Sequence, residues 1–318
     1  MAVAYLNGGG PLYPGVSFTN QTEFCTLIRD LLTSLNWTVV SGTPSNLPIV
    51  FKSAREVNGV YVYLRFYHAN EWGGTIRVRG SINGDPNNLS PEPTISGFQN
   101  SVVPSPIIFG PGLDNRLWAV ADEDTLVIYT RGGDAAGIDP WRTCAYYGRL
   151  DIEVANPLDG WAWGIFDMAV YRSSVAFGQF PGFFARRFAS PVFWQTIPGN
   201  NTTQIEWTGY NFLPELNLSY QTRVASHNVG LNMFDAVQNY KVPIVPFWRC
   251  EEHGHFRGIF KFVVRGLYGA TLDSIHPRYI PEANKIAYYI SFTTGSNGSG
   301  SGGLNWRAGI GGMLIAEN

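Results

Sequence analysis

The spacing of apolar residues near the start of the chain predicts one amphipathic helix over residues 19–36. Six apolar residues recur there at the three- and four-residue intervals of a single helical face: Phe24, Leu27, Ile28, Leu31, Leu32 and Leu35. Asn20 and Glu23 have the spacing of a capping box, in which side chains satisfy the free amides of the first turn. We therefore expect a helix whose apolar face lies against a sheet.

After the helix the apolar residues alternate with a period of two, which predicts strands. In residues 60–67, Val60, Val62, Leu64 and Phe66 fall on one face, and residues 75–79 repeat the alternation with Ile76 and Val78 facing inward. Further strands are predicted over residues 37–40, 117–121, 125–130, 146–154, 258–266, 285–293 and 304–315, and a turn over 41–44. The pattern predicts a mainly β fold, with antiparallel β-sandwich-like domains, the leading helix and long loops.

Two segments interrupt this pattern. Residues 84–112 hold six prolines, which prevent regular strand pairing, and residues 157–198 are dense in tryptophan, phenylalanine and glycine. A Gly/Ser run over 295–303 predicts a hairpin loop. We place the boundary of an N-terminal β domain at 1–155, followed by an aromatic segment and a C-terminal β region at 156–318, either as a second unit or packed with the first.

The acidic pairs do not form a recognisable active site. Asp122, Glu123 and Asp124 occupy the turn between two predicted strands, where acidic residues favour solvation, and Glu251 and Glu252 are the next pair. A glycan-cleaving enzyme needs two carboxylates of different pKa across a bond, and nothing here predicts one. We interpret both groups as surface charge, and we expect no enzymatic activity.

The amino-acid composition indicates that partners bind this protein. Of the 318 residues, 14% are charged, against roughly 25% in average soluble domains, while 14% are aromatic. Protein interfaces show the same depletion of charge and enrichment of aromatic residues, so we expect partners to cover much of the surface. A large β domain with an aromatic core is the alternative. The net charge of −2 disfavours nucleic acid as a partner.

Neither a membrane nor a cofactor is predicted. No apolar run approaches the roughly 20 residues of a membrane span, and residues 1–14 lack the features of a signal peptide, so we expect assembly in a host cytoplasm. The three cysteines are scattered and are expected to be reduced and mostly buried. Cys250, His253 and His255 are weak candidates for metal ligands, because no second cluster of ligands follows them.

The order of several strand motifs resembles a group of virion structural proteins from tailed bacteriophages, encoded among tail and baseplate components. The motifs are VNGVYVYLRFY at 57–67, TIRVRGSING at 75–84, NRLWAVADEDTLVIYTR at 115–131, CAYYGRLDI at 144–152 and GIFKFVVRGLYGATLDSI at 258–275. The resemblance implies packed β-structure, oligomerisation and contacts made by loops. It brings no catalytic residues, and residues 157–245 match nothing in it.

We therefore expect a virion component of the baseplate, tail tip or neck, located in the particle and bound to copies of itself and to other virion proteins. The predicted interface anchors, chosen because Trp and Arg dominate interface hot spots, are Trp161, Trp163, Phe183, Phe184, Arg186, Arg187 and Trp194. The alternatives are a capsid decoration protein and a glycan-binding or glycan-cleaving receptor protein. No cofactor is expected.

Overall fold

The computed structural model describes the chain in fifteen stretches. They are residues 2–10, 12–57, 59–69, 75–81, 106–108, 114–132, 142–151, 161–169, 182–185, 193–196, 249–252, 255–271, 273–280, 283–292 and 308–318. Most of the proline-rich 84–112 loop and most of the aromatic 157–198 segment lie outside these residues.

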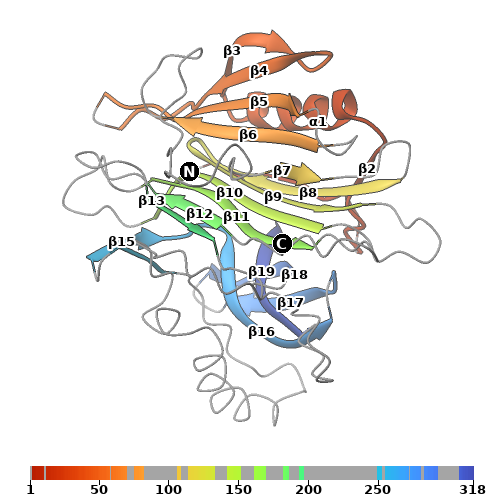
Figure 1. Cartoon of the computed structure of the whole chain (residues 1–318). Coiled ribbons are helices and arrows are strands. Elements are labelled where there is room, and N and C mark those ends of the chain that lie inside the picture. Colours follow the sequence, from red (N-terminus) through yellow and green to blue (C-terminus); the bar gives the residue numbers. More distant parts are fainter. Residues whose placement is uncertain are drawn as a thin grey trace, which may run out of the picture.

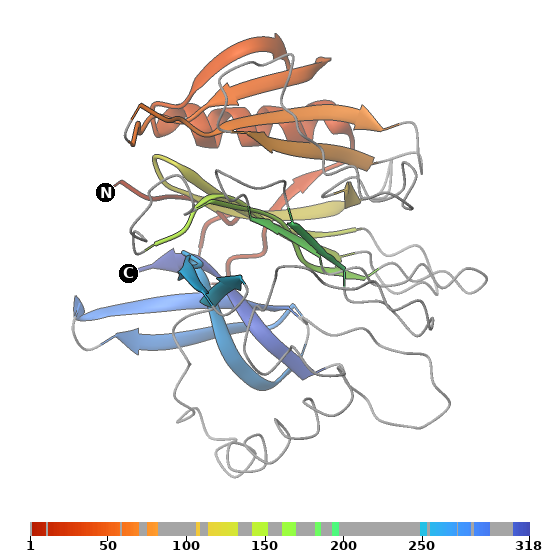
Figure 2. The same ribbon diagram turned by 60° about the vertical axis from the view of Figure 1, so that its left-hand side comes forward.

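The described residues form antiparallel sheets stacked in layers, as Figures 1 and 2 show from two sides. The first sheet has the order β3 (Thr38–Thr43), β4 (Asn46–Lys52), β5 (Tyr63–Ala69), β6 (Thr75–Ser81) and β7 (Pro106–Ile108). The second contains β1 (Ala4–Leu6), β8 (Asn115–Ala121), β9 (Thr125–Arg131), β10 (Arg142–Arg149), β11 (Trp161–Ala169), β12 (Gly182–Ala185) and β13 (Phe193–Thr196), with β2 (Val16–Phe18) also paired to β8. The third has the order β16 (Val263–Thr271), β19 (Ala308–Glu317), β18 (Lys285–Phe292) and β17 (Ile275–Ile280). A short hairpin joins β14 (Arg249–Glu252) to β15 (His255–Ile259).

The predicted fold class is confirmed: the protein is mainly β, antiparallel, with one N-terminal helix in the part of the chain described. The helix, α1 (Gln21–Ser34), begins as the capping pattern predicts, because the Asn20 side chain accepts from the Glu23 amide at 2.9 Å. The Glu23 carboxylate accepts from the Thr19 amide at 2.7 Å, and these hydrogen bonds with Thr19 hold the pKa of Glu23 below its usual range. In the described residues, no helix has the length and apolar character needed to span a membrane.

The first core lies between the first and second sheets, with α1 packed into it. Its buried side chains come from all three elements. They include Phe24, Ile28 and Leu32 of α1, Phe51, Leu64 and Phe66 of the first sheet, and Leu117, Ile128 and Tyr147 of the second. The alternation predicted for residues 60–67 is confirmed from Val62 onward, since Val62, Leu64 and Phe66 are buried and the residues between them are only partly covered, whereas Val60 is only partly buried. Burial of the apolar helix face against both sheets is what fixes the helix in place.

The opposite face of the second sheet packs on the third sheet and forms a second core. Trp118, Tyr129 and Tyr146 meet Phe260 and Met313 there, all of them buried. Strands β8, β9 and β10 of the second sheet are therefore covered on both faces. This explains why β8, β9 and β10 are almost continuously buried rather than alternating.

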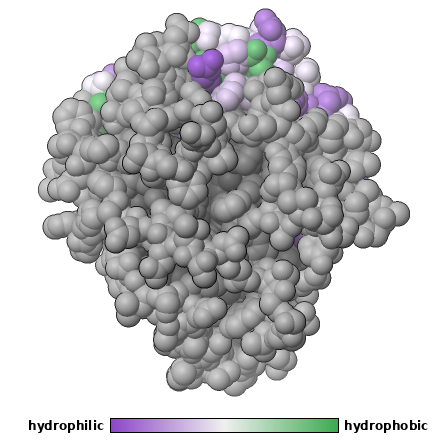
Figure 3. Space-filling model, in the orientation of Figure 1, coloured by the Kyte–Doolittle hydropathy of each residue, from purple (hydrophilic) through white to green (hydrophobic). Residues whose placement is uncertain are grey.

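Several strand predictions were wrong in their boundaries. The turn predicted over 41–44 lies at 44–45, because β3 continues to Thr43 through two irregularities in its pairing with β4. The strand predicted over 146–154 is β10, which begins at Arg142 and ends at Arg149. All six residues of β3 are exposed, and the surface in that region mixes hydrophilic with hydrophobic residues (Figure 3). The single strand expected over 258–266 is two strands, broken by a turn in which Phe262 has φ of +62°.

The predicted domain boundary falls within the second sheet. β10 and β11 pair in register from Arg142↔Ala169 to Arg149↔Trp161, so residues before and after position 156 share one sheet. Cys25 and Cys144 are reduced and buried, as expected, and burial raises the pKa of the Cys25 thiol to about 12.

Candidate functional site

The β8–β9 turn, which sequence reasoning placed on the surface, is buried. The side chains of Asp122 and Asp124 have no exposed area, and only Glu123 is partly exposed. The prediction of surface charge was therefore wrong for both aspartates. The reason is tertiary: the first and third sheets close over this turn from opposite sides, and both come from distant parts of the chain.

A single lysine lies between the two aspartates. Lys261, in the turn between β15 and β16, places its Nζ 2.6 Å from Asp124 Oδ1 and 2.9 Å from Asp122 Oδ2. The lysine side chain is 9% exposed. We call Lys261, Asp122 and Asp124 the buried ion cluster. It joins residues 137 and 139 positions apart in sequence.

The backbone of the same turn is bound to the first sheet. Asp122 O accepts from Trp37 Nε1 at 2.7 Å, and Glu123 O accepts from the amides of Ala54 and Arg55 at 3.0 and 3.1 Å. Unpaired buried carbonyls are costly, so these bonds fix the turn. The β8–β9 turn is thus the point at which all three sheets are tied together.

The end of β10 forms the remaining wall of the cluster. Arg149 N donates to Asp124 O at 3.2 Å, and the Tyr146 hydroxyl donates to Arg149 O at 2.5 Å. Burial, with a smaller contribution from Asp122, raises the pKa of Tyr146 well above its ordinary value, so this hydroxyl stays protonated. Gly148 has φ of +130° and lies so close to the turn that a Cβ there would stand 2.3 Å from Asp124 O.

The two carboxylates are not equivalent. Asp122 Oδ1 accepts from the Asp124 amide at 2.9 Å and Oδ2 accepts from Lys261. Asp124 Oδ1 accepts from Lys261 and from Thr125 Oγ1, but its buried Oδ2 has no hydrogen-bond partner among the described residues, with Arg55 Nη1 at 3.7 Å. Burial raises the pKa of Asp122, against the opposing effect of Lys261. The cluster therefore holds one lysine and two acids of different environment.

A second ionic contact joins the second sheet to the third. The Arg142 guanidinium donates to Asp273 from Nε at 2.9 Å and from Nη2 at 2.7 Å, and the Tyr129 hydroxyl donates to the same carboxylate at 2.5 Å. Arg131 Nε lies 3.6 Å away. The Asp273 and Arg142 side chains are 12% and 13% exposed, so water screens this pair only weakly.

Replacing Asp273 with asparagine is expected to lower the free energy of unfolding by about 1.5–3 kcal/mol, because the amide cannot accept both guanidinium hydrogen bonds. Chemical denaturation measures the change. The matched control is Asp30→Asn, whose partner Arg29 is on the exposed surface of α1 at 2.7 Å. That control should change the free energy by less than about 1 kcal/mol. Equal effects for both variants would show that the Asp273 contact does not hold the sheets together.

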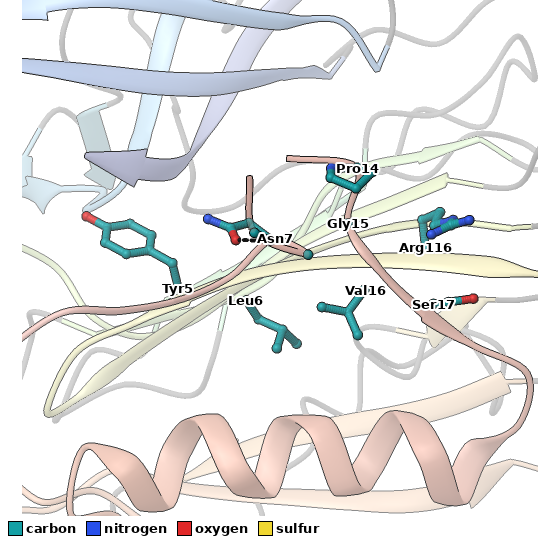
Figure 4. A pocket seen from close by; sticks show the side chains of 10 residues that line it. Tyr5, Leu6, Asn7, Pro14, Gly15, Val16, Ser17 and Arg116 are labelled. Atoms are coloured by element: carbon teal, nitrogen blue, oxygen red, sulfur yellow. Dashed lines mark hydrogen bonds between the residues drawn. The ribbon is translucent and has the colours of Figure 1, made fainter. Parts of the chain in front are cut away.

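A shallow depression lies beside the N-terminal loop (Figure 4). It has a volume of about 580 Å³ and is lined by residues 5–9 and 14–17 and by Arg116. The loop is closed by Gly15 N, which donates to Asn7 O at 2.9 Å, and Trp118 Nε1 donates to Tyr13 O at 2.8 Å. Its polar side chains already have partners in the protein: Asn7 binds Ile315 O, and Ser17 and Arg116 both bind Asp114. The depression therefore offers no free charged group to a ligand.

The predicted interface residues fall on the far end of the second sheet. The backbone pairs Trp163 with Phe184 and Phe184 with Trp194, so these residues occupy adjacent register positions on β11, β12 and β13. Trp161 pairs with Arg149 of β10, and Phe183 pairs with Gly164 and Gln195. Arg186 and Arg187 lie outside the described residues. The structure thus brings three of the seven predicted anchors into one row across neighbouring strands.

The weak metal candidates are only partly described. Cys250 and His255 lie on β14 and β15, where the register pairs Cys250 with Gly258 and His255 with Glu252, and His253 lies outside the described residues. Within the described ranges, no group of three His, Cys, Asp or Glu side chains could hold a metal ion.

Sequence reasoning missed the buried ion cluster, although one signal for it was present. Lys261 stands alone between Phe260 and Phe262 in an otherwise apolar stretch. A buried lysine needs a carboxylate partner, and the 122–124 turn is one of the two acidic groups that the sequence analysis singled out. Compared with known proteins, the chain matches no family model, no curated protein and no solved structure.

Proposed function

We propose that this chain is a structural subunit of a tailed-bacteriophage particle, in the baseplate, tail tip or neck. It acts by binding copies of itself and neighbouring virion proteins, and not by catalysis. The observation that carries the proposal is the row formed by Trp163, Phe184 and Trp194 at the end of the second sheet. We call these three residues the aromatic row.

The position of the aromatic row favours contact with a partner. Among the described strands β13 is the last of the second sheet, and the outer edge of such a strand carries backbone donors and acceptors available to another chain. Addition of a partner strand or loop at a sheet edge is a common mode of protein recognition. Tryptophan is enriched at the energetic centres of interfaces.

The buried ionic contacts also support a role as a structural subunit. The buried ion cluster and the Asp273 contact both join one sheet to another, so these buried charged groups hold the layers together. A subunit whose layers are fixed in this way presents a preformed binding surface, and preformed surfaces lose less conformational entropy on association. Heterologous contacts between such subunits close into a ring when the rotation between copies permits.

Replacing Trp194 with alanine is expected to weaken self-association of the purified protein at least tenfold, because truncation of an interface hot spot costs about 2 kcal/mol or more. Sedimentation velocity over a range of concentrations measures the change, and circular dichroism checks that the fold is kept. Leu12→Ala is the control, since Leu12 is 78% exposed in the N-terminal loop, away from β13 in sequence and sheet order.

Two results would contradict the proposal. One is a wild-type protein that stays monomeric at high concentration and is absent from purified particles. The other is the same association constant for Trp194→Ala and the wild type. Electron microscopy of labelled particles then separates the locations: an axial ring supports the baseplate, tail tip or neck, whereas three-, five- or sixfold positions on the shell support a capsid decoration protein.

A further inference from the structure

The buried ion cluster has the geometry of two groups poised to form a covalent bond. Lys261 Nζ lies 2.6 Å from Asp124 Oδ1, and the second carboxylate, Asp122, lies 2.9 Å from the same nitrogen. When an amine and a carboxyl group react within one molecule, effective concentrations reach about 10⁵–10⁸ M in well-oriented cases. Proximity therefore removes the main entropic barrier to condensation.

The buried ion cluster is enclosed by protein. Asp122 and Asp124 are fully buried, and the rings of Tyr146 and Phe260 pack beside the turn that carries Lys261, with their centroids 4.9 Å apart. Burying an ammonium and two carboxylates away from water costs free energy. An amide would leave the site with one charged group fewer of each sign.

We propose that Lys261 and Asp124 become joined by an intramolecular amide bond, with Asp122 transferring the protons. The assignment of Asp124 as the reacting acid follows from its hydrogen bonds. Asp122 is held on both oxygens, by the Asp124 amide and by Lys261, whereas Asp124 Oδ2 has no hydrogen-bond donor among the described residues. The less restrained oxygen is the one free to leave.

The reaction balances without any other reagent. The Lys261 ammonium gives a proton to the Asp122 carboxylate, and the nitrogen lone pair attacks the carboxyl carbon of Asp124. The new N–C bond forms as one C–O bond of Asp124 breaks. Asp122 relays two protons from the nitrogen to the departing oxygen, which leaves as water, and Asp122 ends in its starting state. An ammonium and a carboxylate become a neutral amide and one water, with no oxidant or reductant.

Asp122 is suited to this proton transfer. Its Oδ2 is within hydrogen-bond distance of the amine, as a general base requires. Burial raises its pKa, which brings the carboxyl group closer to the range in which it can both accept and return a proton. The Tyr146 hydroxyl is bound to Arg149 O at 2.5 Å, so it is not the proton acceptor.

The cross-link would connect the β8–β9 turn to the start of the third sheet. Its ends are 137 residues apart in sequence, and it would stand where backbone hydrogen bonds also tie the turn to the first sheet. All three layers would then be anchored at a covalent junction. This inference does not depend on the proposed function, because it concerns bonding within one chain.

The test is mass spectrometry of the denatured full-length wild-type protein. The expected mass is lower than the sequence mass by one water molecule, and proteolytic digestion is expected to give a branched peptide that contains Asp124 and Lys261. Denaturation before measurement ensures that only a covalent bond is counted. A chain with the full sequence mass, whose digest contains the unlinked Lys261 peptide, would overturn the proposal. A mass loss without the branched peptide would overturn it equally.

Three variants assign the atoms. Lys261→Arg keeps the positive charge but is expected to have its full sequence mass. Asp122→Asn keeps both reacting groups and removes the proton acceptor, so the linked fraction is expected to fall at least tenfold. Lys285→Arg is the matched control, because Lys285 binds Glu317 at 2.7 Å with 45% of its side chain exposed, and it should still lose one water. Unchanged linkage in Asp122→Asn would refute the assigned proton transfer. The wild-type spectrum decides the bond itself, even if a variant fails to fold.

Discussion

Lys261→Met is expected to lower the free energy of unfolding by about 3–5 kcal/mol at neutral pH, the cost of removing one partner from a buried ion pair. Methionine keeps the length of the side chain but removes the cation that binds both Asp122 and Asp124, and leaves Arg55 Nη1 3.7 Å from Asp124 Oδ2, beyond hydrogen-bond distance. Both carboxylates are fully buried, so water cannot replace the lysine. The loss is expected whether the native contact is an ion pair or an amide, because methionine can form neither.

The variant should also acquire a strong dependence on pH. Burial raises the pKa of Asp122 even with Lys261 present, and removal of the lysine takes away the group that opposes this rise. An acid whose folded pKa is raised stabilises the fold when it is protonated. The variant should therefore be most stable below the unfolded pKa of aspartate, about 3.9, and should lose stability as the pH rises from there through the raised folded pKa of Asp122.

Denaturant unfolding at a series of pH values measures both effects. Lys285→Met is the control, since it removes an equivalent lysine from an exposed pair with Glu317, and it should cost less than about 1 kcal/mol with little change in pH dependence. If Lys261→Met and Lys285→Met were equally stable at neutral pH, the turn would not hold the layers together.

The elements that sequence predicted well are those whose signal is local. The helix follows from apolar spacing and from Asn20 and Glu23, which form the predicted cap. The β8–β9 hairpin follows from two apolar runs around an acidic turn, and its strands are within a few residues of those expected. In each case the residues that determine the structure are neighbours in sequence.

What sequence could not predict depends on distant partners. The composition of the 122–124 turn is the same whether it faces water or Lys261, and its partner lies more than a hundred positions away. The break in the 258–266 strand is similar. Phe262 adopts a positive φ there, and its carbonyl accepts from the Leu314 amide at 2.8 Å, a contact made only when β19 returns to the sheet.

The buried ion cluster brings together strand motifs that lie far apart in the sequence. The 115–131 and 258–275 segments are in direct contact through Asp122, Asp124 and Lys261. The 144–152 segment supplies Tyr146, Gly148 and Arg149 around the same turn. Three separate motifs thus meet at a single structural junction.

Gly148→Ala is expected to lower the free energy of unfolding by about 2–6 kcal/mol. Two costs combine. The backbone at Gly148 has φ of +130°, which an alanine adopts only with strain of about 1–3 kcal/mol. The added Cβ would also stand 2.3 Å from Asp124 O and 2.7 Å from Thr125 Cα, so the β8–β9 turn must move at a further cost of about 1–3 kcal/mol.

Gly59→Ala separates the two costs. Gly59 also has a positive φ, +79°, but a Cβ there meets no atom within 4 Å. That variant should lose only the conformational term, about 1–2 kcal/mol. If Gly148→Ala and Gly59→Ala had the same free energy of unfolding, the β8–β9 turn would accommodate the new methyl group at no energetic cost. The hydrogen bonds around the turn would then not fix its position.

A double variant tests whether Gly148 acts through the buried ion cluster. If the methyl group at position 148 displaces Asp124 from Lys261, part of its cost is the loss of that contact. In a Lys261→Met background this part is already gone, so Gly148→Ala should cost less there than in the wild type, by about 0.5–3 kcal/mol. Gly59→Ala should cost the same in both backgrounds, because no Cβ contact links it to the turn. If Gly148→Ala cost the same in both backgrounds, the methyl group would displace the backbone of the turn without weakening the contact between Asp124 and Lys261.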